Sequence, residues 1–166
     1  LDDMARGIRC LLEDEPALAS GYAAELSRLN VDRRELESKM QSEALAQVDE
    51  RLASLAGHVP AGVCVFDAGW HQGVIGLVAS RVKDRLHRPV IAFAPSDPGW
   101  VKGSARSVAG VHVRDVLDAI ATREPGLLAK FGGHAMAAGL TLAAADLDRF
   151  ARAFDAEVAR WQEGGS

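Results

Sequence analysis

Three short segments of the sequence combine glycine with polar or cationic side chains. They read GWHQGVIG at 69–76, KGSARS at 102–107 and FGGHAMAAGLTL at 131–142. Glycine lets the main chain approach a ligand where a side chain would stand in the way. Ammonium, guanidinium and hydroxyl groups are common protein partners of phosphate oxygens. These residue types therefore predict that the segments bind an anion, and a phosphate in particular.

The central segment has the clearest spacing for this chemistry. Lys102, Ser104 and Arg106 alternate with small residues, so on a strand their side chains point to one face. An ammonium, a hydroxyl and a guanidinium fork in a row make a phosphate grip, and Gly103 permits close approach of the main chain. The alternative is the polar, exposed face of an edge strand. The small residues favour the phosphate grip, because an ordinary exposed strand rarely needs Gly, Ser and Ala together.

The third segment begins with a pair of glycines, Gly132 and Gly133, followed by His134. A glycine pair costs backbone entropy, so we expect it to let a ligand touch the main chain. We expect GGHAMAA to turn into a brief helix with His134 at its start, where the ring can bind a phosphate or an incoming strand. The alternative is a tight helix–sheet packing motif with a structural histidine.

The first segment lies between a predicted strand and a predicted helix. Glycines in such a loop can aim backbone N–H groups at an anion, although the segment matches neither a Walker loop nor the dinucleotide fingerprint. Trp70 can stack on a base or cover the end of the sheet, and we favour the structural role. We expect His71 to be a cap or a surface residue rather than a catalytic base.

The sequence contains no pattern of an autonomous hydrolase. It has no H-E-x-x-H motif, no closely spaced aspartates and no cysteine set, and Asp67 is a lone carboxylate at a predicted strand end. Cys10 and Cys64 are far apart, which suits a reducing compartment. With no apolar run long enough for a membrane and no visible signal peptide, we expect a cytoplasmic protein. The net charge of −4 argues against a generally basic nucleic-acid binder but allows a local basic stripe.

The apolar pattern predicts an α/β sandwich whose sheet is at least partly parallel. Helical spacing predicts a helix at 2–12, a restart capped by Asp14, and then one long helix that either belongs to a bundle or connects two domains. The run 63–66 is typical of a strand buried on both faces, and 100–108 of a strand interrupted by Gly103. The other predicted elements are strands at 89–94 and 139–142, and helices at 73–87, 112–121, 125–130 and from 146.

Taken in order, the three segments resemble the DHHA1 domain of the RecJ family of single-strand-specific exonucleases. The resemblance covers roughly residues 60–158, and the ordered trio is more specific than any one segment. It implies a DHHA1-type mixed sheet flanked by helices and preceded by a long connector helix. The implied domains are 1–20 as the end of a DHH domain, 21–58 as the connector, 59–162 as DHHA1 and 163–166 as a tail.

The resemblance also implies a function. The chain would be the substrate-binding part of a 5′-to-3′ single-stranded-DNA exonuclease of repair and recombination, with Mn²⁺ or Mg²⁺ held by a DHH domain whose ligand motifs are missing here. The fragment alone would then be inactive. The alternatives are a phosphodiesterase of short oligonucleotides or cyclic dinucleotides, and a non-catalytic single-strand-binding module. A single-strand-binding protein is an expected partner, and the oligomeric state is left open.

The resemblance assigns roles to residues as well. Ser104 and Arg106 would hold the terminal 5′ phosphate or its neighbours, with Lys102 and His71 as further phosphate contacts. Gly132, Gly133 and His134 would face the cleft close to the scissile phosphate, with His134 in a supporting catalytic role. The sequence has SAR at 104–106 where many members of the family carry SGR.

Overall fold

The computed structural model describes residues 16–54, 57 and 59–164. The chain divides into two compact units, residues 1–42 and 43–166. Helix α2, Pro16–Ala53, begins in the first unit and ends in the second. The helix predicted at 2–12 and the cap at Asp14 lie outside the described residues, whereas the long helix itself is confirmed over α2.

The second unit is built on a mixed five-stranded sheet with strand order β1-β2-β3-β5-β4. Among the strands of the described residues, β1 and β2 run parallel and the other three pairs are antiparallel. The α/β class and the partly parallel sheet are therefore confirmed. The strands are β1 Val63–Phe66, β2 Val90–Pro95, β3 Trp100–Arg106, β4 Lys130–Gly133 and β5 Ala137–Ala143.

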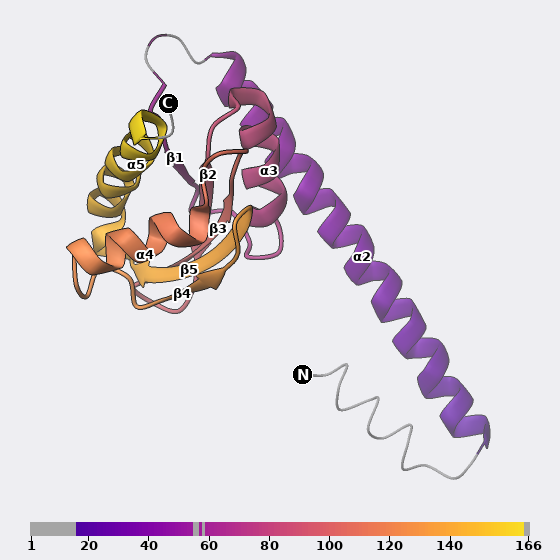
Figure 1. Ribbon diagram of the computed structural model, residues 1–166. Helices are drawn as coiled ribbons and strands as arrows, with labels where there is room; N and C mark the ends of the chain where they lie inside the picture. The colour runs from indigo at the N-terminus through magenta and orange to yellow at the C-terminus, as the bar shows by residue number, and fades with distance from the viewer. Residues whose placement is uncertain (1–15, 55–56, 58, 165–166) are drawn as a thin grey trace. The chain divides into compact units, whose positions relative to one another are not determined.

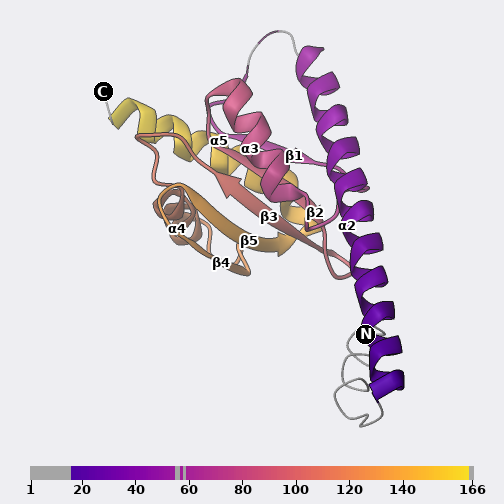
Figure 2. The same ribbon diagram turned by 90° about the vertical axis from the view of Figure 1, so that its right-hand side faces the viewer.

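Helices cover both faces of this sheet (Figure 1). Helix α3, Ile75–Leu86, packs on β2 and β3 from one side. Helices α4, Val113–Arg123, and α5, Leu147–Gly164, pack on each other and on the opposite side of the sheet. Figure 2 shows α3 lying over the part of the sheet next to β1, with β5 and β4 beyond it. We call the two sides the α3 face and the core face.

The main hydrophobic core lies on the core face, between the sheet and helices α4 and α5. It forms because β2, β3 and β5 each direct alternate apolar residues to that side, which is the two-residue period of a strand. Three phenylalanine rings fill its centre, with Phe93 edge-on to Phe150 at 5.8 Å and Phe150 stacked on Phe154 at 6.0 Å. The buried core residues include Ile91, Val101, Ala105, Val116, Leu117, Ile120, Leu140, Leu142 and Val158.

Two strand predictions need correction. The run 63–66 does form a strand, but β1 lies at an edge of the described sheet and Phe66 is 39% exposed, so β1 is not buried on both faces. Gly103 does not interrupt β3, which pairs with β2 over 101–106 and with β5 over 100–106. Glycine fits at this position because a Cβ would lie 2.7 Å from the Phe93 ring and 2.9 Å from Ile91.

Two helix predictions are wrong. Residues 125–129 form a turn that leads into β4 at Lys130, because Gly126 takes a left-handed φ of +88° that ends helical geometry. The stretch GGHAMAA forms a β-hairpin rather than a brief helix, so His134 does not start a helix. Gly133 has a φ of +144°, and the His134 N–H donates to the Ala137 carbonyl at 2.8 Å across the turn.

Among the described residues, no helix has the length and apolar character that crossing a membrane requires. The remaining predicted elements are confirmed, including the strand at 89–94 and the helices that begin near 75, 113 and 147.

His112 caps α4 with its Nδ1, which accepts from the Asp115 N–H at 3.2 Å.

Asp67, at the end of β1, fixes the last turns of α2 against the sheet. Its Oδ2 accepts from Gln47 at 2.7 Å and from Arg51 at 2.6 Å, and its Oδ1 accepts from the Gly69 N–H at 2.8 Å. The backbone hydrogen bond from Gly69, together with the Arg51 and Gln47 contacts, holds the pKa of the Asp67 carboxyl below its ordinary value. The carboxylate predicted as solitary is thus a structural anchor.

Replacing Gly103 by alanine is expected to lower the free energy of unfolding by about 1–3 kcal/mol, because the added methyl must displace Phe93 and Ile91 in a packed core. Gly132→Ala is the matched control, since a Cβ there has nothing within 4 Å. Urea denaturation of both variants measures the difference. Equal stability of the two variants would contradict the packing described for β3.

Asp67→Asn is expected to destabilise the chain near neutral pH and to make little difference in acid. Because the pKa of Asp67 is lower in the folded state than in the unfolded state, its stabilisation is complete above the unfolded value and disappears as the pH falls through the folded value. Urea denaturation at about pH 7 and about pH 3 measures the difference in unfolding free energy between the unaltered chain and Asp67→Asn, which should become smaller at the lower pH. Asp84→Asn is the control, because Asp84 is exposed and pairs with Lys83 at 3.0 Å. A difference in unfolding free energy between Asp67→Asn and the unaltered chain that stays the same at both pH values would reject the anchor.

Candidate functional site

Strand pairing brings the second and third glycine-containing segments side by side on the α3 face. The register of β3 with β5 and of β5 with β4 sets polar and glycine residues opposite one another on that face. This set runs across three adjacent strands, and β3 is an interior strand rather than an edge. We call this set of polar and glycine residues the strip. It comprises Lys102, Ser104 and Arg106 of β3, Gly139 and Thr141 of β5, and Lys130 and Gly132 of β4.

The strip is ordered in rows across the strands. Thr141 pairs with Lys102 on one side and with Lys130 on the other. Neighbouring strands lie about 4.8 Å apart, so the Cα atoms of the two lysines are separated by roughly 10 Å. The next row along pairs Gly139 with Ser104 and with Gly132. A row of two glycines and a serine thus adjoins a row that carries two ammonium groups.

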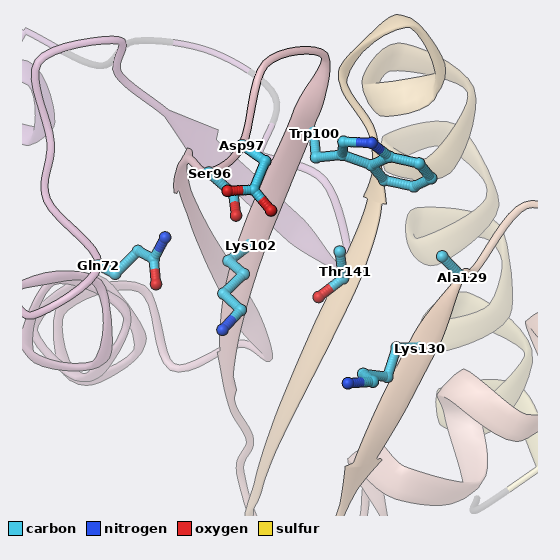
Figure 3. Close-up of a pocket in the computed structure, with 8 residues that line it drawn as sticks. All are labelled: Gln72, Ser96, Asp97, Trp100, Lys102, Ala129, Lys130 and Thr141. Atoms are coloured by element: carbon cyan, nitrogen blue, oxygen red, sulfur yellow. The ribbon is translucent and has the colours of Figure 1, made fainter.

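The glycine row leaves the sheet surface bare. A Cβ at Gly132 would have nothing within 4 Å, and one at Gly139 would find only the Gly103 carbonyl oxygen at 3.9 Å. The space above them is an open hollow, lined by Lys102, Lys130, Thr141 and their glycine neighbours. A second hollow adjoins it toward the β2–β3 turn, and Figure 3 shows Lys102 and Lys130 on either side of Thr141 there.

The first glycine-containing segment joins the strip through the start of α3. A Cβ at Gly76 would lie 2.7 Å from Arg106 Nη2 and 3.7 Å from Ser104 Oγ. Gly76 therefore lets the first turn of α3 pass directly over Arg106. Gln72, in the loop before α3, lines the second hollow together with Lys102. All three segments consequently meet on one face, as a shared anion site requires.

The cations of the strip are not neutralised by acidic neighbours. Lys102 and Lys130 are exposed and Arg106 is half-buried, and in the described part of the chain none of the three forms an ion pair. Arg106 Nη1 donates to the neighbouring Ala105 carbonyl at 2.8 Å, which holds the guanidinium against the strand. The first turn of α3 adds the positive end of a helix dipole beside it. The strip is therefore a local positive patch on an acidic chain.

The two glycines of the pair differ in what they do. Gly132 belongs to the strip, whereas a Cβ at Gly133 would lie 2.5 Å from the Ala137 carbonyl oxygen within the hairpin. Gly133 is thus required by the turn itself. His134 is exposed at the hairpin tip, at the same end of the strands as Arg106, because Arg106 pairs with Ala137 and the His134 N–H bonds Ala137.

Trp70 and His71 are not among the residues that line the two hollows. Trp70 is only 6% exposed, and its Nε1 donates to Gln47 Oε1 at 3.2 Å, which agrees with the structural role predicted for it. His71 is exposed, and its Nδ1 accepts from the Gly73 N–H at 3.0 Å. This bond caps the turn before α3, as expected for a cap or surface residue.

Sequence reasoning missed several residues of the site. The sequence pattern places Lys130 in a helix and assigns Thr141 and Gly139 only to a strand. Gln72 and Trp100 also line the second hollow without having been singled out as its residues. The available signal was the two-residue alternation of AAGLTLA in β5, which sends Gly139 and Thr141 to one face and Leu140 and Leu142 to the other.

In the described ranges 16–54 and 59–164, no group of three or more His, Cys, Asp or Glu side chains could hold a metal ion. One acidic residue, Asp97, lines the second hollow together with Lys102. What these residues can do chemically is bind and orient an anion.

The model of the DHHA1 domain matches residues 58–160. The chain belongs to the DHHA1 family. The matched residues include the whole sheet and helices α3 and α4, so the strip lies entirely within this DHHA1 domain.

Curated relatives of this DHHA1 domain are named single-stranded-DNA-specific exonuclease RecJ. The protein from Dickeya dadantii is 48% identical over 161 residues, which cover 97% of this chain and 28% of the relative. The chain therefore spans between 17% and 28% of the length of the curated relatives it matches. The resemblance to RecJ found in the three segments is confirmed.

Solved structures agree with this relationship. An exonuclease RecJ bound to manganese is 33% identical, with a TM-score of 0.61, over 94% of this chain and 36% of that one. RecJ from Thermus thermophilus in complex with Mg²⁺ is 32% identical, with a TM-score of 0.59, over 94% and 23% respectively. The mixed α/β fold of this DHHA1 domain is thus the fold found in RecJ.

Gly76→Ala is expected to displace the Arg106 guanidinium while leaving the fold intact, because the new methyl meets the movable end of that side chain at 2.7 Å. The ¹⁵N resonance of Arg106 Nε should shift, and the melting temperature should change little. Gly132→Ala, with open space at its Cβ, is the control for the resonance. A lower melting temperature without a change in the ¹⁵N resonance of Arg106 Nε would show that the added methyl at residue 76 meets other atoms.

Proposed function

We propose that this chain is the substrate-binding part of a metal-dependent single-stranded-DNA exonuclease that hydrolyses phosphodiesters from the 5′ end. Its role is in DNA repair and recombination. The strip on the α3 face binds the sugar–phosphate backbone of the strand. The observation that carries the proposal is the set of Lys102, Lys130 and Arg106, cations without acidic partners among the described residues, beside the bare main chain at Gly132 and Gly139.

The names of the relatives support the class of substrate. Proteins that are 45–48% identical to this chain over 97% of its length are named single-stranded-DNA-specific exonucleases. These relatives are much longer than the chain. We therefore propose residues 1–20 as the end of a preceding DHH domain, 21–58 as a connector, 59–162 as the DHHA1 domain and 163–166 as a tail.

The strip suits a polyanion for electrostatic and steric reasons. Phosphate contacts by Lys and Arg release counterions and provide affinity without regard to base sequence. Strand β5 is paired on both sides, so its N–H and C=O groups are already used in the sheet. Gly139 therefore contributes room rather than a free donor, which lets sugar and phosphate lie directly on the sheet surface.

Individual residues take the following roles in the proposal. Ser104 and Arg106 hold the terminal 5′ phosphate, beside the first turn of α3. Lys102 and Lys130 neutralise phosphates further along the strand. His134, at the Arg106 end of the strip, stands near the scissile phosphate in a supporting role, while Gly133 shapes the hairpin that carries it. His71 contributes at the edge of the site from the turn that it caps.

We propose that the metal is held by a part of the longer protein other than the described residues of this chain. Solved RecJ structures are described with Mg²⁺ and with Mn²⁺, and these ions are the cofactors we propose for the longer protein. The described residues of this chain offer no cluster of donor groups for them. Their contribution to turnover is therefore to bind the strand, neutralise its charge and fix the phosphodiester in one orientation.

The leading alternative is a phosphodiesterase of short oligonucleotides or cyclic dinucleotides, and a further one is a single-strand-binding module without chemistry. The spread of the cations along the strip favours a longer strand, because phosphates on both sides of Thr141 can be contacted at once. A cytoplasmic location and a single-strand-binding protein as partner complete the proposal.

The strip is expected to set the salt dependence of binding. Each phosphate neutralised in a single strand contributes about −0.7 to the slope of log affinity against log salt, so three cations give a slope of roughly −2. Lys102→Ala, Lys130→Ala and Arg106→Ala should each make the slope shallower by about 0.7. Fluorescence anisotropy with a labelled 5′-phosphorylated oligonucleotide measures the affinity at several salt concentrations, and hence the slope for the unaltered chain and for each variant.

Lys83→Ala is the control, because Lys83 lies on α3 and pairs with Asp84 at 3.0 Å. An equal effect of Lys83→Ala, or equal affinity for a blunt duplex, would contradict the proposal. Affinity that does not increase from a dinucleotide to a longer oligonucleotide would favour the short-substrate phosphodiesterase.

A further inference from the structure

The strip ends at an exposed tryptophan that is not accounted for by packing. Trp100, the first residue of β3, is 42% exposed, whereas Trp70 is 6% exposed and Trp161 packs against the core. Its side chain lines the second hollow together with Lys102 and Lys130. Figure 3 shows the indole near Thr141 and Ala129, with both lysines further along the same surface. An exposed aromatic thus adjoins the cations of the strip.

The main chain holds Trp100 in place from both neighbouring segments. Its N–H donates to the Asp97 carbonyl at 2.8 Å, and its carbonyl accepts from the Ser96 N–H at 2.9 Å. On the other side Trp100 is opposite Ala143 in the β3–β5 register, and Ala144 N–H donates to the Gly99 carbonyl at 2.9 Å. A ring on so rigid a support loses little conformational freedom when a ligand covers it.

The charges around Trp100 separate the two parts of a nucleotide. Asp97 lines the same hollow and repels phosphate from the Trp100 end, while Lys102 and Lys130 attract it to the other end. A base has no charge to be repelled and has a flat face for an aromatic ring. The arrangement therefore places phosphate over the lysines and a base over the indole.

We propose that Trp100 is a base-stacking platform that binds an unpaired nucleobase of the strand whose phosphates contact Lys102 and Lys130. This inference rests on the proposed function and adds a base subsite to it. Stacking on an aromatic side chain requires an unpaired base, because both faces of a base in a duplex are already covered by its neighbours. Trp100 therefore also adds to the preference for single strands.

The test compares two oligonucleotides of equal length, one with bases and one composed of abasic sites, by fluorescence anisotropy at low salt. Trp100→Ala is expected to weaken binding of the base-bearing strand by about 10-fold and to leave the abasic strand unaffected, because only stacking is lost. Trp100→Phe should retain most of the affinity. Phe66→Ala, an exposed aromatic on the far edge strand β1, is the matched control and should change neither affinity.

The outcomes separate this inference from the function on which it rests. If the strand binds through the lysines but Trp100→Ala leaves its affinity unchanged, or weakens the abasic strand equally, the platform is rejected and the proposed function stands. If neither strand binds the unaltered chain, the proposed function is rejected together with the platform.

Discussion

The register between β3 and β5 is the constraint on which the rest of the site depends. Ser104 opposite Gly139 and Lys102 opposite Thr141 put polar and glycine residues on one face, while Val101 opposite Leu142 fills the core on the other. Because side chains alternate along a strand, a slip of one residue would bury the lysine and expose the leucine. The hydrophobic core therefore fixes the position of the cations without contacting them.

Part of this arrangement could be predicted from local pattern. The alternation of Lys102, Ser104 and Arg106, the buried strand β2 and the helices that follow the strands are all determined by neighbours in sequence. The order of the strands is not determined by neighbours in sequence, because it depends on contacts between distant segments. For that reason the apolar run 63–66 predicts a fully buried strand, although β1 lies at an edge of the described sheet.

The hairpin from β4 to β5 shows most clearly where sequence reasoning fails. Small residues around His134 and Met136 fit a helix by propensity, but pairing of β4 with β5 outweighs that local preference. Lys130 is missing from the predicted site because the sequence pattern places it at the end of a short helix at 125–130, whereas it is the first residue of β4. The glycines were recognised as important, yet only coordinates separate Gly132, which leaves the surface open, from Gly133, which shapes the turn.

Strand β4 also bears on how separate molecules meet. It forms one edge of the described sheet, and such an edge offers unpaired backbone groups on which a strand from another chain could assemble. Here the edge is four residues long, carries a lysine and ends in two glycines. Shortness, charge and poor strand propensity all discourage edge-to-edge aggregation. The composition that opens this surface to a ligand thus also makes it a poor template for amyloid-like growth.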